Sequence, residues 1–473
     1  KDSRRLLTAT QAKAIDLKKA LEYSPKNAWE STHYNSKELE ALSKSYCRFI
    51  SENKTEREVV IAITDLVKKA GFHEKTGNSF YMVNRHKNIA VVRIGERDLS
   101  RGVKLIMAHV DSPRLDLKQN PLYEDTQLAF FKTHYYGGIK KYQWVTRPLA
   151  LHGVVLLKSG KTLSISVGEK DSDPVFFISD LLPHLSHKAQ DDKKVHEAIP
   201  SEKLNLLIGS IPFNTKEEIK DKVKLAILSA LNKKYGIVEE DFLSAELEAV
   251  PAGKAREIGF DRSMIAAYGQ DDRICAFTAL QAILAAEQTD DTYVVVLVDK
   301  EEIGSDGNTG AKSHFLKQVI KQIYLNKHKK VDALQIDECL YNSHAISSDV
   351  NGALDPDWKD VHEEQNAAKL GFGVCVTKFT GARGKSGASD ANAEYLARLH
   401  RTLSEHHVIW QTGELGKVDE GGGGTIAKFL AEYGMEVVDM GPALLSMHAP
   451  MECSSKIDLL MTFKGYKVFL EKF

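Results

Sequence analysis

Residues 292–305 read TYVVVLVDKEEIGS, and this stretch decides the fold class. Its first seven residues are mostly β-branched and apolar, and the charged residues Asp299 to Glu302 follow at once. An apolar run of this kind is typical of a strand buried on both faces, as in a parallel sheet covered by helices. Adjacent carboxylates at the end of such a strand repel and need a cation or solvent. The stretch predicts an α/β sheet with a polar site at its carboxyl edge.

Strand and helix patterns alternate from about Gly259 onward, and two short apolar runs before His109 resemble the same strands. Near-continuous apolar strands separated by helices favour a mostly parallel sheet with helices on both faces. Helices are predicted at 36–70, 272–287, 314–326, 392–404 and 425–433, and strands at 88–94, 103–108, 292–298, 333–336, 345–348, 372–379, 408–411 and 437–440.

The middle of the chain has a different pattern. Residues 149–157 and 163–167 flank a Lys-Ser-Gly-Lys turn, as in a β-hairpin, and 243–250 alternates between apolar and polar residues. One amphipathic helix is predicted at 215–235. We therefore expect a discontinuous α/β domain, residues 1–117 and 253–473, interrupted by a β-rich inserted domain, residues 118–252.

Composition excludes several classes of function. The 64 basic and 65 acidic side chains nearly cancel, so no net field favours nucleic acid or an anionic membrane. No apolar run approaches the roughly 18 residues of a membrane span, and the segment 1–21 has mixed charge. The five cysteines are scattered without a C-x-x-C pair, which indicates reduced thiols. We expect a cytoplasmic protein that binds neither nucleic acid nor membrane.

Five nitrogen or oxygen donors lie at or near predicted strand ends, in an order that suits a metal site. Taken singly, each has a plainer interpretation as a surface pair, a helix cap, a solvated turn or a core histidine. Together they form a set without cysteine, and such sets suit Zn, Mn or Co in an open hydrolytic site. The five donors are His109, Asp271, Glu302, Asp349 and His448, and Asp111 and Glu301 are two further carboxylates beside them.

The residues around these donors form four short motifs that can be compared with those of known families. Ala108-His-Val-Asp-Ser-Pro113, Gly269-Gln-Asp-Asp-Arg273, Asp299-Lys-Glu-Glu-Ile-Gly-Ser305 and Met447-His448 occur in this order. They resemble the aspartyl aminopeptidase and aminopeptidase I family of dizinc metalloaminopeptidases. The resemblance covers nearly the whole chain, and it implies a zinc-exopeptidase-like catalytic domain that removes single residues from peptides with a free N-terminus.

The resemblance also implies a role for each donor. Asp271 is expected to bridge two divalent ions. The expected metal is zinc, and cobalt and manganese are the alternatives. His109 and Asp349 complete one site, and Glu302 and His448 complete the other. Glu301 is then the general base and Asp111 the carboxylate that orients His109.

For the inserted domain, the resemblance implies dimer contact and access to a neighbouring subunit's active site. His184, in Pro183-His184-Leu185, is the residue expected to hold the substrate or the developing oxyanion there. The implied assembly is a homo-oligomer built from dimers, a tetrahedral dodecamer that admits short peptides.

Two questions stay open at this level. The preferred N-terminal residue is either acidic, with a cation supplied from Lys378, Arg383 or Lys385, or neutral and leucine-like. Alternative functions are a deacylase or carboxypeptidase with the same metal centre, and a catalytically silent scaffold. Gly421 to Gly424 lack the Lys-Ser/Thr of a P-loop, so a flexible turn beside the site is preferred to a phosphate cradle.

Overall fold

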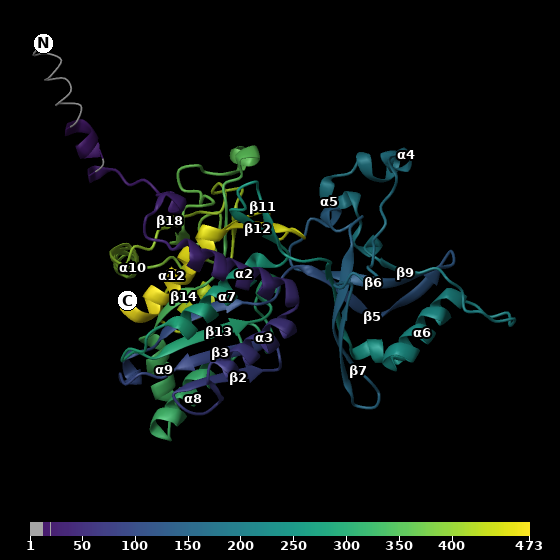
Figure 1. Cartoon of the computed structure of the whole chain (residues 1–473), viewed down its shortest axis with the longest axis horizontal. Helices are drawn as coiled ribbons and strands as arrows, with labels where there is room; N and C mark the ends of the chain where they lie inside the picture. The colour runs from purple at the N-terminus through teal and green to yellow at the C-terminus, as the bar shows by residue number, and fades with distance from the viewer. Residues whose placement is uncertain (1–12, 19) are drawn as a thin grey trace, which may run out of the picture.

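The computed structural model describes residues 13–18 and 20–473. Most of the mixed-charge segment expected at 1–21 lies outside the described residues. The chain forms two lobes, one built on a nine-stranded sheet and the other on a six-stranded sheet (Figure 1). No helix in the described part of the chain has the length and apolar character needed to cross a membrane.

The nine-stranded sheet has the order β1-β2-β3-β13-β4-β14-β20-β16-β18. Its four central strands run parallel, so their carboxyl ends meet at one edge. These strands are β13 (Tyr293–Val298), β4 (Lys104–His109), β14 (His344–Ser347) and β20 (Glu436–Gly441). The outer strands are β1 (His73–Glu74), β2 (Ser79–Asn84), β3 (Asn88–Arg93), β16 (Val374–Thr377) and β18 (Trp410–Thr412).

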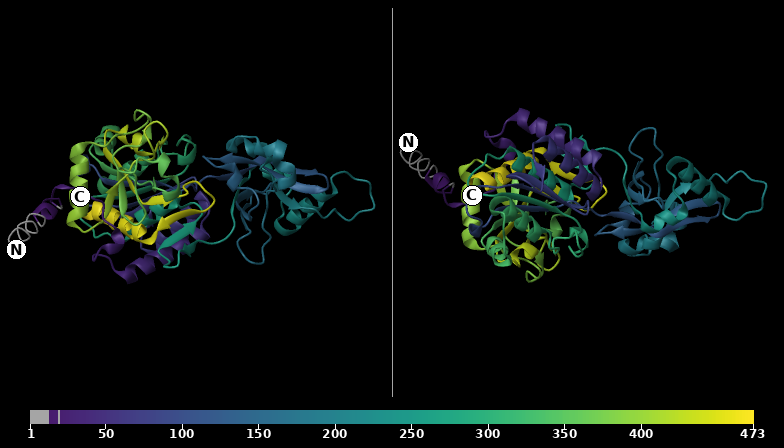
Figure 2. Two further views of the ribbon diagram at one scale, coloured as in Figure 1. Left: turned by 90° about the horizontal axis from the view of Figure 1, so that it is seen from above. Right: turned by 90° about the horizontal axis from the view of Figure 1, so that it is seen from below.

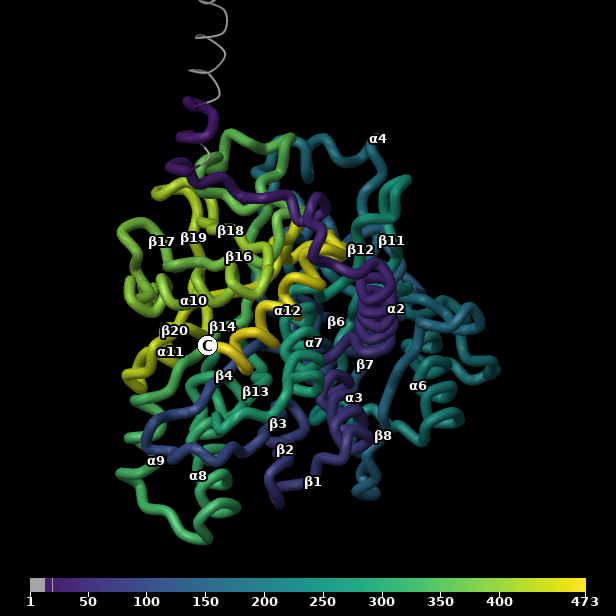
Figure 3. Tube along the Cα trace, turned by 60° about the vertical axis from the view of Figure 1, so that its left-hand side comes forward, coloured from purple at the N-terminus to yellow at the C-terminus, as the bar shows by residue number. Residues whose placement is uncertain are grey.

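Helices cover both faces of this sheet, as the apolar strands require. One face packs against α2 (Ser36–Glu52), α3 (Glu56–Lys69), α7 (Gln270–Ala285), α10 (Ala393–Glu405) and α12 (Lys456–Lys472). The other packs against α8 (Phe315–His328), α9 (Ala333–Tyr341) and α11 (Ala427–Ala431). Helix α7 lies beside α2 and α12, which explains why it is buried on nearly every side (Figure 3).

The six-stranded sheet is antiparallel throughout and has the order β8-β7-β10-β5-β6-β9. Helix α6 (Lys222–Tyr235) packs on it, and the lobe has an apolar cluster of its own around Trp144. In both views of Figure 2 this lobe lies beside the larger one. Its elements are β5 (Arg114–Asp125), β6 (Leu128–Tyr136), β7 (Leu149–Leu156), β8 (Thr162–Val167), α4 (Pro183–Ser186), α5 (Val195–Ala198), β9 (Leu206–Gly209) and β10 (Glu246–Pro251).

A third, five-stranded sheet has the order β11-β12-β22-β21-β15 and carries residues next to the strand ends of the large sheet. Its strands are β11 (Arg256–Ile258), β12 (Met264–Ala267), β22 (Glu452–Ser455), β21 (Ala443–Leu445) and β15 (Asn351–Gly352). Two short strands, β17 (Gly381–Ala382) and β19 (Gly422–Gly423), pair nearby.

Several predicted elements differ from the structure. The strand predicted at 333–336 is wrong, because the Asp332 side chain accepts a hydrogen bond from Gln335 N and starts helix α9. The helix predicted at 36–70 is divided in two, since Thr55 and Glu58 form a capping box. Helix α12 was not predicted, and burial on most of its faces removes the amphipathic pattern that reveals a helix.

Candidate metal centre

The carboxyl edge of the large sheet brings together donors that are far apart in the sequence. His109 is the last residue of β4, and Asp349 follows β14 by two residues. Glu301 and Glu302 begin a short 3-10 helix, Glu301–Ile303, which starts three residues after the last residue of β13. Asp271 lies in the first turn of α7, and His448 lies between β21 and β22. The parallel register of the central strands places these segments at the same level.

His109 is held so that one ring nitrogen faces the other donors. Its Nδ1 lies 3.1 Å from the carbonyl oxygen of Asp111 and 3.3 Å from that residue's Oδ1. A carbonyl oxygen only accepts, so Nδ1 carries a proton, and in the neutral ring Nε2 is the nitrogen available to a metal. Nε2 lies 3.2 Å from Asp271 Oδ1 and 3.9 Å from Asp349 Oδ1.

His448 has a matching arrangement on the other side of Asp271. Its Nδ1 donates to the carbonyl oxygen of Gly138 at 3.0 Å, so in the neutral ring Nε2 is again the nitrogen available to a metal. Nε2 lies 3.1 Å from Asp271 Oδ2 and 3.4 Å from Glu302 Oε2. The two oxygens of Asp271 therefore face two different imidazoles, as a carboxylate does when it bridges two ions.

Asp111 contacts both halves of the centre and is fully buried. Its two oxygens accept hydrogen bonds from the backbone N–H groups of Glu301 and Glu302, each at 3.2 Å. The hydroxyl of Tyr136 donates to Asp111 Oδ2 at 2.8 Å. One carboxylate thus fixes the ring of His109 and the turn that carries Glu301 and Glu302.

The residues present fit a divalent metal such as zinc. Burial raises the pKa of Glu302 and of Asp349 well above the usual range, because carboxylates crowd together away from water. Glu302 Oε1 is buried and has no hydrogen-bond partner among residues 13–18 and 20–473. Imidazole nitrogens and carboxylate oxygens without a thiolate are the donors expected of a hydrolytic zinc site.

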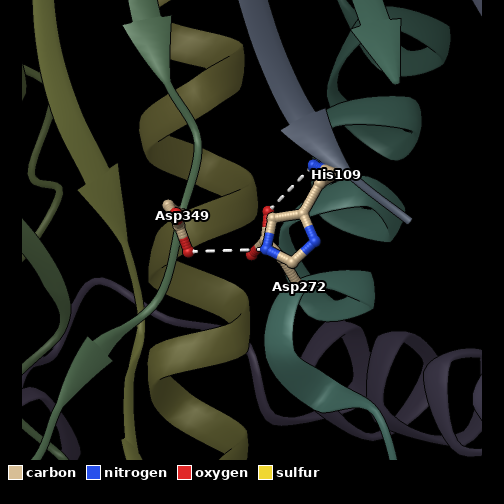
Figure 4. A group of neighbouring side chains, drawn as sticks. All are labelled: His109, Asp272 and Asp349. Atoms are coloured by element: carbon tan, nitrogen blue, oxygen red, sulfur yellow. Dashed lines mark hydrogen bonds and ion pairs between the residues drawn. The ribbon is translucent and has the colours of Figure 1, made fainter. Parts of the chain in front are cut away.

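Asp272 contacts the metal centre and does not act only as a cap of helix α7. Its Oδ2 accepts a hydrogen bond from the backbone N–H of His109 at 3.3 Å. Figure 4 shows its carboxylate beside the His109 ring, with Asp349 opposite. Ligand atoms of His109, Asp272 and Asp349 lie within 4.8 Å of one another, and so do those of His109, Asp271 and Glu302. The sequence singled out Asp271 and gave Asp272 no part in the site.

Glu452 is a second residue that the sequence did not single out. Its Oε2 accepts from the backbone N–H groups of Gln270 at 2.6 Å and Asp271 at 3.2 Å, and its Oε1 accepts from that of His448 at 2.8 Å. Burial raises its pKa to about 8, and the charge of Asp271 adds to this effect. The only signal in the sequence is an acidic residue four positions after His448.

A cavity of about 250 Å³ opens onto the centre. Glu301 lies on its wall, where burial and then the charges of Asp111 and Asp271 raise its pKa to about 7. Gly421 to Gly424 also line this cavity, so they lie beside the site as expected. The rest of the lining includes both cations and apolar side chains, namely Arg383, Lys385, Lys417, Phe379, Leu415 and Val418.

Two of the three candidate specificity cations are already paired. Lys378 and Lys385 contact Asp390 at 2.7 and 3.0 Å, and Lys378 does not line the cavity. Arg383 lines the cavity and has no ion-pair partner in the described part of the chain. His184 lies exposed on α4 in the other lobe and does not line the cavity of its own protomer.

The chain is similar to known zinc aminopeptidases in sequence and in structure. The family model described as "Aminopeptidase I zinc metalloprotease (M18)" matches residues 49–470. A "Probable M18 family aminopeptidase 1" of Clostridium acetobutylicum is 52% identical, covering 94% of this chain and 98% of that protein. The crystal structure of an M18-family aminopeptidase from Thermotoga maritima superposes with a TM-score of 0.91 at 50% identity, over 96% of this chain and 100% of that one.

A more distant likeness shows the fold alone. The S. cerevisiae mApe1 dodecamer has a TM-score of 0.73 at 22% identity, over 91% of this chain and 97% of that one. The sequence motifs predicted membership of a zinc aminopeptidase family. The family match and the similar proteins confirm this prediction. The chain therefore belongs to the M18 family of aminopeptidase I zinc metalloproteases.

Proposed function

We propose that this chain hydrolyses the N-terminal residue from short peptides with a two-metal centre. One observation carries the proposal: the two oxygens of Asp271 lie 3.2 and 3.1 Å from the Nε2 atoms of His109 and His448. This arrangement supports Asp271 as the bridge, with His109 and Asp349 at one ion and Glu302 and His448 at the other. Zinc is the proposed metal, and the same donors also accept cobalt or manganese.

When bound as a pair, two divalent ions lower the pKa of a shared water and polarise the scissile carbonyl. The chain itself supplies the proton transfers. Glu301 lines the cavity and has a pKa of about 7, so its carboxylate is suited to take a proton and to return it to the leaving amine. Asp111 holds the backbone of Glu301 in place, which supports a positioning role for this carboxylate.

We also propose that residues 118–252 form an inserted dimerisation domain. Around α4 and α5 this lobe exposes the apolar side chains of Leu181, Leu182, Leu185 and Val195, which favours a covered surface in an assembly. The yeast dodecamer supports a larger homo-oligomer, built from dimers, for this chain. His184 would then reach the cavity of a neighbouring subunit rather than its own.

Changing His184 to Ala is expected to lower kcat/KM for an unblocked dipeptide by at least about tenfold, because one group near the substrate is lost. Bound zinc and the oligomer mass are expected to stay the same. Steady-state kinetics and metal analysis on the same preparation measure both. His187→Ala, an exposed histidine three residues away, is the control. Equal kinetics in the two variants would remove His184 from the site.

The proposed activity is tested with paired peptides that differ only in an acetyl group on the N-terminus. We expect the zinc-loaded chain to release the first residue of the free peptides and to leave the acetylated ones intact. Cleavage of the acetylated peptides supports the deacylase or carboxypeptidase alternative, and no hydrolysis of any free dipeptide supports the silent scaffold. Asp-, Glu- and Leu-initiated peptides belong in the panel, since the cavity wall carries both Arg383 and apolar side chains such as Leu415.

A further inference from the structure

The segment Tyr136-Gly137-Gly138 connects the six-stranded sheet to the metal centre of the same chain. Tyr136 is the last residue of β6 and pairs with Arg114, the first residue of β5. The segment continues with Gly137 and Gly138 after the end of β6. In the structure, each end of it contacts a different half of the metal centre.

At one end, Tyr136 holds Asp111. Its hydroxyl donates to Asp111 Oδ2 at 2.8 Å, and the guanidinium of Arg114 lies 3.7 Å from the centre of its ring. Arg114 is buried and is itself fixed by Asp116 at 2.8 Å and Glu248 at 3.2 Å. The position of the hydroxyl is therefore set by the six-stranded sheet, because β5 and β10 carry these residues.

At the other end, Gly138 holds His448. Its carbonyl oxygen accepts a hydrogen bond from Nδ1 at 3.0 Å, so in the neutral ring the lone pair lies on Nε2. The approach is close, since a Cβ at Gly138 would lie 3.3 Å from that Nδ1. Gly137 has a φ of +73°, and a Cβ there would lie 3.3 Å from the Cβ of Glu302. Both glycines let the backbone pass against the donors.

We propose that Tyr136, Gly137 and Gly138 form a positioning segment that orients both metal-binding histidines from the six-stranded sheet. Tyr136 acts on His109 through Asp111, and Gly138 acts on His448 directly. The proposal rests on the metal ligands of the proposed function, and it adds that metal retention depends on this lobe in the same chain. Groups that orient a metal-binding imidazole typically affect metal affinity by about 10- to 100-fold.

The test is zinc retention by the full chain, measured by competition with a chromogenic chelator. Tyr136→Phe keeps the ring over Arg114 and removes only the hydroxyl, so we expect zinc affinity to fall by about 10- to 100-fold. The control is Tyr135→Phe, the preceding residue, whose side chain is 41% exposed and whose hydroxyl makes no hydrogen bond within the described residues. Equal zinc affinity in the two variants overturns the proposal.

A second variant separates positioning from general stability. Gly138→Ala adds a Cβ against His448, and we expect one of the two ions to dissociate faster while the other is retained. The melting temperature of the metal-free protein should fall by no more than a few degrees in either variant, because each change is confined to one contact. A lowered metal-free melting temperature with unchanged zinc affinity contradicts the positioning role. Failure of the wild-type chain to hydrolyse free peptides overturns the proposed function instead, since zinc retention is read without any substrate.

Discussion

Replacing Glu301 by Gln is expected to lower kcat by about 10²- to 10⁴-fold, while the chain keeps its zinc. The amide has nearly the same shape as the carboxylate, but it cannot take a proton from water. The loss corresponds to about 3 to 5 kcal/mol of transition-state stabilisation. Glu301 makes its contacts to the centre through its backbone N–H, which donates to Asp111, so the substitution leaves the turn in place.

Metal analysis and kinetics on one preparation check this result. Glu420→Gln removes a carboxylate from the segment beside the cavity without altering the lining, and it serves as the matched control. Loss of zinc in the Glu301 variant would mean that the roles of Glu301 and Glu302 are exchanged. Full activity with zinc retained would remove Glu301 from the proton transfers.

Changing Asp271 to Ala is expected to eject both ions and abolish activity. Each of its oxygens faces one of the two imidazoles, so the substitution removes a donor from both sites at once. Of the proposed ligands, Asp349 then keeps only His109 beside it, and Glu302 keeps only His448, which is too few protein donors to hold an ion in either site. The zinc content per chain, measured by atomic spectroscopy after gel filtration, is expected to fall from about two to near zero.

The control for this variant is Asp439→Asn. Asp439 lies on β20, next to β14 in the large sheet, and its side chain is buried like that of Asp271. It is not one of the proposed ligands. The Asp439 variant should retain zinc. A single fully occupied site in the Asp271 variant would disprove the bridge and would point to Asp272, whose carboxylate lies within 4.8 Å of the ligand atoms of His109 and Asp349.

The location of the candidate site could be predicted because it depends on residue types in a fixed order at strand ends. Parallel strands align their carboxyl ends, so an apolar strand followed by Glu301-Glu302 and another ending in His109 predict a shared site. The hydrogen-bond partners could not be predicted. Glu452 reaches Asp271 and His448 through contacts with their backbone N–H groups, and no spacing in the sequence records such a contact.

Local signals also failed where packing overrides them. The apolar residues at 333–336 are compatible with a strand or a helix. The Asp332 side chain accepts a capping hydrogen bond from Gln335 N, and this favours the helix. Helix α12 is surrounded by α2, α7 and α10, so its apolar residues occur on every face and give no helical period.

The sequence alone determined the α/β class and the family, because strand patterning and motif order depend on residue types, and it supplied the five proposed donors. The tertiary structure alone decided how those donors are held. It placed Tyr136 and Gly138, from the six-stranded sheet, against Asp111 and His448. Such contacts join residues up to 310 positions apart, and only the folded packing of the two lobes brings them within hydrogen-bond distance.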